Sequence, residues 1–83
     1  MELKTIRPNA REIELADGTR VLFSYSVPVA AYVPTRGLMR TEAFYSRTTS
    51  GHVAAWFLKE FCVPVSHAET VAQSELDRLM RSK

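Results

Sequence analysis

Eight consecutive residues concentrate the polar chemistry of this chain: Tyr45-Ser46-Arg47-Thr48-Thr49-Ser50-Gly51-His52. They place hydroxyls, a guanidinium and an imidazole directly before the most apolar helical stretch. The first turn of a helix exposes unpaired amide hydrogens and a partial positive charge, which together can bind an anion. The hydroxyls of Thr48, Thr49 and Ser50 could therefore cradle a phosphate. Arg47 would be its counter-charge, and Arg40 could add a second guanidinium if its strand lies adjacent.

The same residues also suit the plain start of a helix. Thr48 or Thr49 would then be the N-cap, and the remaining hydroxyls would satisfy local backbone groups. The sequence favours this cap, and the anion site stays open beside it.

Catalysis and metal binding are not supported by these side chains. A nucleophilic Ser46 or Ser50 would need His52 as base and a third group to orient the imidazole, and no carboxylate stands at a suitable spacing. His52 and His67 lie near the starts of two different predicted helices, and no third ligand accompanies them. We therefore expect no enzymatic activity, no metal and no cofactor.

Composition places the chain among folded domains. Its 83 residues are 46% hydrophobic and 24% charged, which predicts one domain, residues 1–83, with a core. Eleven basic and nine acidic residues leave a net charge of +2 without a basic cluster, so nucleic-acid binding is not favoured. A single cysteine, Cys62, excludes an internal disulfide and is expected to be buried. No apolar run approaches the roughly 20 residues of a membrane span, and no signal peptide is evident, which indicates a cytoplasmic protein.

A hairpin is the clearest predicted element. Residues 12–15 and 20–25 flank Ala16-Asp17-Gly18, and Asp-Gly is a strong turn signal. A three-residue loop with Gly18 in the left-handed conformation pairs Ile13 with Val21 and Glu14 with Arg20, which is better matched than the register of a two-residue loop. In the second strand, Val21, Phe23 and Tyr25 are expected to face the core.

The rest of the sheet follows from turn residues. Pro28 should break or bulge the ladder between Ser26 and Val29. Further strands are predicted over residues 29–33 and 38–45, and the buried face of the latter stays open. After an N-terminal segment, residues 1–10, the predicted meander covers residues 11–45.

Two helices are predicted after the meander, over residues 48–62 and 66–81. In the first, Val53, Phe57 and Phe61 form the core stripe, and Trp56 lies beside His52 at the core boundary with its indole nitrogen free to reach a polar partner. The second opens with a capping box from Ser66 to Glu69. The predicted fold class is α+β: a four-stranded antiparallel β-meander followed by two α-helices packed on one face of the sheet.

Two motifs carry a family resemblance: Ser24-Tyr25-x-x-Pro28-Val29-Ala30 and Ser46-x-Thr48-Thr49-Ser50-x-His52. Over residues 12–80, the chain resembles a family of small uncharacterised proteins of tailed phages and other prokaryotic viruses. It departs from that pattern at Val27, where threonine is expected, and at Gly51, where a basic residue is common. The resemblance implies a viral accessory protein of the host cytoplasm that binds and does not catalyse.

The expected function is a small non-enzymatic viral accessory protein that binds a host or viral protein, for example to inhibit a host process such as defence. A homodimer is compatible with this expectation, and a membrane is not expected to be involved. The alternative is a small anion- or nucleotide-binding protein that uses the start of the first helix, and the third is a DNA-binding accessory factor. The candidate partner- or anion-binding residues are Arg40, Tyr45, Arg47, Thr48, Thr49, Ser50, His52 and Trp56.

Overall fold

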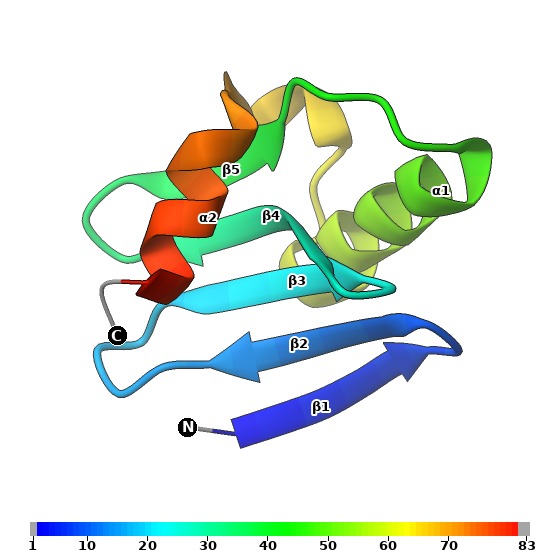
Figure 1. Cartoon of the computed structure of the whole chain (residues 1–83). Coiled ribbons are helices and arrows are strands. Elements are labelled where there is room, and N and C mark those ends of the chain that lie inside the picture. The colour runs from blue at the N-terminus through cyan, green and yellow to red at the C-terminus, as the bar shows by residue number, and fades with distance from the viewer. Residues whose placement is uncertain (1, 82–83) are drawn as a thin grey trace.

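One sheet organises the chain in the computed structural model, which describes residues 2–81 (Figure 1). Its six strands lie side by side in chain order. They are β1 (Glu2–Arg7), β2 (Ala10–Glu14), β3 (Arg20–Ser24), β4 (Val27–Val33), β5 (Gly37–Thr41) and β6 (Glu69–Val71). The first five form an antiparallel meander, whereas β6 pairs parallel with β5. The α+β class is confirmed, and the sheet is larger and mixed.

Helical segments lie on both faces of this sheet. They are α1 (Arg47–Trp56), the π-helical turn η1 (Phe57–Phe61), the 3-10 turn η2 (Val65–His67) and α2 (Gln73–Arg81). In Figure 1, α2 crosses in front of β4 and β5, and α1 lies behind the sheet. None of the helices described for residues 2–81 is long and apolar enough to span a membrane.

Two separate cores correspond to the two faces. The α1 side buries Leu22, Val29, Ala30, Val53, Trp56 and Phe57. The α2 side buries Val21, Ala31, Met39, Val71 and Leu76. The expectation that both helices cover one face was therefore wrong. Adjacent residues of β3, Val21 and Leu22, are both fully buried, as in strands covered on both sides.

The predicted β2–β3 hairpin is confirmed in its register. Ile13 lies opposite Val21 and Glu14 opposite Arg20. Leu15 closes the loop by donating its amide to the Thr19 carbonyl at 2.8 Å, and Gly18 has φ +90°, the left-handed conformation that the three-residue loop requires. The local pairing chemistry was sufficient to choose this register.

The predicted irregularity at Pro28 is also confirmed. The β3–β4 register shifts between Leu22 and Phe23, which pair with Ala30 and Pro28 and leave Val29 as the extra residue. Tyr25, expected on the core face, lies instead in the turn with φ +60° and is exposed. Tyr25 has a positive φ and is exposed because the chain reverses direction there, between the end of β3 and the start of β4.

The boundaries of two sheet elements differ from expectation. Residues 1–10 were predicted as an N-terminal segment, yet β1 pairs with β2 there, and Asn9 at φ +66° makes the connecting turn. The strand predicted over residues 38–45 ends at Thr41, whose hydroxyl accepts the Ala43 amide at 3.0 Å and starts a loop. The open question of its buried face is answered by Met39, which packs on the α2 side.

The first helix has nearly the predicted length, but its N-cap residue and its buried face differ from those predicted. Ser46 is its N-cap, and the helix ends at Cys62, which is exposed with φ +58° instead of buried. Its buried residues include His52 and Trp56, so the core stripe is rotated from the predicted one. A purely apolar stripe omitted His52 because the sheet residue that satisfies its polar nitrogen is distant in sequence.

The second helix is shorter than predicted. Ser66 lies in η2, and Glu69 begins β6, so the capping box does not form. Thr70 and Val71 are β-branched, and β6 satisfies backbone groups of β5 while Val71 enters the α2-side core. Pairing and burial together outweigh an N-cap, which contributes about 1 kcal/mol. The predicted helix is correct only over α2.

Candidate functional site

A cavity of about 380 Å³ opens between the loop that follows β5 and the first half of α1. Its apolar walls come from β4, α1 and η2 through Val29, Val53, Ala54 and Val65. Four of the predicted candidate residues also line it, namely Arg40, Tyr45, Thr49 and Ser50. Sequence-distant segments therefore converge on one apolar space with a polar margin, the usual composition of a binding pocket.

Arg40 supplies an unsatisfied donor to this cavity. By the alternation of β5, its side chain projects on the same side as Leu38, which packs against the α1-side core. The Nε of Arg40 is buried and has no hydrogen-bond partner within residues 2–81. Glu42 lines the same cavity and is exposed. An unpartnered buried N–H costs about 1 to 3 kcal/mol, so an external acceptor would be favoured here.

Two aromatic residues form the outer rim of the cavity. Phe44 is 74% exposed and Tyr45 is 46% exposed, and both line the opening. Phe44 was not among the sequence-predicted site residues, because it was assigned to a strand whose faces could not be distinguished. The one sequence feature that could have identified Phe44 as a site residue was its position next to Tyr45.

The first turn of α1 is capped by its own side chains. Ser46 Oγ accepts the Thr49 amide at 3.1 Å, and the Ser46 carbonyl accepts the Ser50 amide at 3.0 Å. Arg47 and Thr48 are exposed and do not line the cavity. The helix-cap interpretation therefore describes this turn, with Ser46 in place of Thr48 or Thr49.

His52 faces the sheet and not the cavity. Its Nδ1 lies 2.9 Å from Ser24 Oγ, which in turn lies 2.9 Å from Thr49 Oγ1. Burial lowers the pKa of His52, and the nearby positive charge of Arg7 lowers it further. Ser24 and His52 are 2% and 5% exposed, so this Ser–His pair is shielded from a substrate and bridges α1 to β3. Ser24 precedes His52 by 28 residues, and sequence spacing did not reveal the pair.

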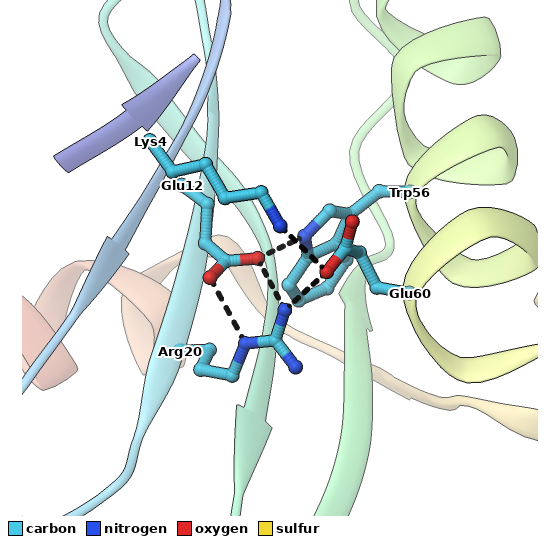
Figure 2. Close-up of polar contacts among 5 residues, drawn as sticks. All are labelled: Lys4, Glu12, Arg20, Trp56 and Glu60. Atoms are coloured by element: carbon cyan, nitrogen blue, oxygen red, sulfur yellow. Dashed lines mark hydrogen bonds and ion pairs between the residues drawn. The ribbon is translucent and has the colours of Figure 1, made fainter. Parts of the chain in front are cut away.

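Trp56 is fully buried, so it is not the boundary contact residue that the sequence predicted. Its indole nitrogen does find a polar partner, because Nε1 donates to Glu12 Oε1 at 2.7 Å (Figure 2). Glu12 is itself buried on β2. The indole of Trp56 therefore links α1 to β2 and is not available to a binding partner.

Arg20 extends this contact into a charged network (Figure 2). Its Nε and Nη2 donate to the two oxygens of Glu12 at 2.9 and 2.8 Å, and its guanidinium lies 4.8 Å from the Phe61 ring centroid. Nη2 also donates to Glu60 at 2.6 Å, and Lys4 Nζ reaches the same Glu60 oxygen at 2.9 Å. The hydrogen bond to Glu12 is the main cause of the raised pKa of Arg20. These hydrogen bonds and ion pairs connect β1, β2 and β3 to the first helix.

The candidate residues thus divide into three groups. The cavity is lined by Arg40, Tyr45, Thr49 and Ser50. Two others, Arg47 and Thr48, are exposed outside it, and His52 and Trp56 are buried and do not line it. Within residues 2–81, no group of three or more His, Cys, Asp or Glu side chains could hold a metal ion.

Fold and site together define a small α+β domain with a mixed sheet between two helices and an apolar cavity with a polar margin. The chain belongs to a family of unknown function, DUF8033, which it matches over residues 1–77. No curated protein and no solved structure matches it significantly.

Proposed function

We propose that this protein is a non-enzymatic domain that binds a protein partner through the cavity and its aromatic rim. The observation that carries the proposal is the position of Phe44, a large apolar side chain that is 74% exposed at the mouth of an apolar cavity. Aromatic side chains beside a pocket are typical of protein interfaces, where they contribute much of the binding energy.

The local structure makes this rim available. The loop begins at the turn that Thr41 caps and ends at the Ser46 cap of α1, so both of its ends are held by hydrogen bonds. Phe44 and Tyr45 lie between these two fixed points. A loop fixed at both ends presents its side chains with less loss of entropy on binding than a free loop would.

Binding is better supported than catalysis because the reactive side chains are engaged elsewhere. His52, the base that the sequence offered, does not line the cavity and contacts buried Ser24. The resemblance to small viral proteins is the reason to expect a partner from the host or the virus, such as a component of host defence.

An anion-binding function is the second candidate, and one observation favours it. Arg40 lines the cavity, and its buried Nε has no acceptor among the residues that the structure describes. A small anion would bind there, near the C-terminal end of β5, whereas the sequence placed the anion at the first turn of α1.

Affinity capture tests the main proposal. The tagged protein and its Phe44→Ala variant are incubated with lysate of the source cells, and captured proteins are identified by mass spectrometry. Leu58→Ala is the matched control, because Leu58 is 66% exposed on η1, away from the cavity. We expect a partner that the wild type and Leu58→Ala retain and Phe44→Ala loses, while all three proteins melt within a few degrees of one another. A partner retained equally by Phe44→Ala would contradict the proposal, as would no partner at all.

A further inference from the structure

We infer that the cavity recognises a peptide segment of the partner in which a carboxylate stands beside an aliphatic side chain, with the carboxylate bound by Arg40. This inference rests on the proposed function and specifies the chemistry of the partner. Three features of the cavity lead to it: the Arg40 guanidinium, which forms no ion pair with the described residues, the apolar walls, and a described lining whose one positive and one negative side chain leave no net charge.

Arg40 differs from two other arginines of the sheet and its turns. Arg20 is paired with Glu12 and Glu60, and Arg36 is paired with Glu69 and Glu75. The chain thus provides carboxylates for both of these guanidinium groups, whereas the buried Nε of Arg40 has no partner in the described part of the chain. A planar guanidinium fits a carboxylate through two parallel hydrogen bonds, and such charge-assisted bonds are stronger than neutral ones.

The walls require the ligand to be apolar next to its charge. The cavity that Arg40 lines is also lined by Val29, Val53, Ala54 and Val65. The cavity volume of about 380 Å³ lies within the range of small-ligand sites. A free carboxylate alone would leave these walls in water, whereas an aliphatic side chain next to it would bury them.

The charge of the cavity favours a carboxylate over a phosphate. Arg40 is the only cation among the described lining residues, and the exposed Glu42 carboxylate belongs to the same lining. One guanidinium can balance the single charge of a carboxylate, whereas this lining offers no second cation to balance a doubly charged phosphate. The amides of Thr49 and Ser50, which could otherwise hold phosphate, already bond to Ser46.

A peptide fits the site better than a small free acid. The exposed rings of Phe44 and Tyr45 extend the apolar surface beyond the cavity itself. A ligand that fills only the cavity would leave this rim uncovered, whereas a chain segment can cover both.

Nuclear magnetic resonance titration provides the test. The probes are two blocked pentapeptides, acetyl-Ala-Leu-Glu-Leu-Ala-amide and its Gln analogue, and the readout is the Nε–H signal of Arg40. We expect a saturable shift with the Glu peptide and about tenfold weaker binding of the Gln peptide, as for the loss of one charge-assisted hydrogen bond. Arg40→Gln should remove the difference between the peptides. Glu42→Gln should strengthen binding of the Glu peptide by about two- to fivefold, because an exposed repulsion is removed.

Several results would overturn the inference: equal binding of the two peptides, a preference for Glu that survives in Arg40→Gln, or a stronger response to inorganic phosphate. Arg40→Gln should melt no lower than the wild type, since it removes an unsatisfied donor, and this is checked first. Arg40→Lys, which keeps the charge without the planar fork, is the second variant and should bind the Glu peptide more weakly than the wild type.

The capture experiment separates this inference from the proposed function. A partner lost with Phe44→Ala and retained with Arg40→Gln would leave the protein-binding function in place and refute the carboxylate specificity. A partner lost with both variants supports the two together.

Discussion

Trp56 and Glu12 share a 2.7 Å hydrogen bond between the first helix and the second strand, and both side chains are buried. The Glu12 carboxylate also accepts two hydrogen bonds from Arg20, so three donors surround one buried negative charge. A buried ion pair is stabilising only while its partners are complete, because removal of one leaves the other desolvated and unpaired.

Replacement of Glu12 by Gln should therefore be among the most damaging conservative changes. We expect a loss of about 3 kcal/mol in the free energy of unfolding, measured by urea denaturation. Glu14→Gln, an exposed residue of the same strand, is the control and should change stability by less than about 0.5 kcal/mol. Equal effects of the two substitutions would show that the network does not stabilise the fold.

Two glycines should respond to alanine in opposite directions. Gly18 has φ +90°, and an added Cβ would lie 3.3 Å from Pro34 Cγ. Gly18→Ala should therefore cost about 1 to 2 kcal/mol. Gly51 lies in α1 with open space around it, so Gly51→Ala should stabilise by about 0.5 to 1 kcal/mol. Thermal unfolding of both variants checks this, and a stabilising Gly18→Ala would contradict the three-residue loop.

Two serines distinguish the observed helix start from the predicted capping box. Ser46 Oγ accepts the Thr49 amide, whereas Ser66 lies exposed in η2. We expect Ser46→Ala to cost about 1 kcal/mol and Ser66→Ala less than about 0.5 kcal/mol in chemical denaturation. The reverse order would indicate that the second helix begins at the capping box after all.

His52 should make stability depend on pH. Burial and Arg7 lower its pKa in the folded state, so below the ordinary value of about 6.5 the unfolded chain binds more protons than the folded one. The free energy of unfolding should therefore fall as the pH decreases from 7 towards 5. His52→Gln should flatten this part of the profile, whereas His67→Gln, an exposed change on η2, should keep it. An unchanged slope in His52→Gln would contradict the assignment.

Local chemistry explains the elements that could be predicted. The β2–β3 register follows from charge and apolar pairing across a turn that Gly18 permits, and the bulge beside Pro28 follows from its missing amide hydrogen. Both effects involve residues that are close along the chain. By contrast, β6 forms by pairing in parallel with β5, where Thr70 lies opposite Arg40. No pattern within residues 66–71 identifies β5 as the neighbouring strand.

Four residues of the cavity lining were among the candidates chosen from the sequence. Tyr45, Thr49 and Ser50 were recognised from one polar segment, and Arg40 was included on the condition that its strand lies nearby. Phe44 was omitted because the strand assigned to it ends at Thr41 and a loop exposes the ring. Phe44 is exposed because β5 ends at Thr41, and the sequence pattern did not reveal that strand end.

The sequence by itself determined the α+β class, the hairpin register and the extent of the first helix, because turn chemistry and periodicity act over a few residues. Only the tertiary structure decided which polar residues are buried. His52 enters the core because Ser24 meets its Nδ1, and Trp56 because Glu12, 44 residues away, accepts from its indole. Burying a polar group costs much less free energy when it has a hydrogen-bond partner, and partners this distant come together only when the sheet packs against the helix.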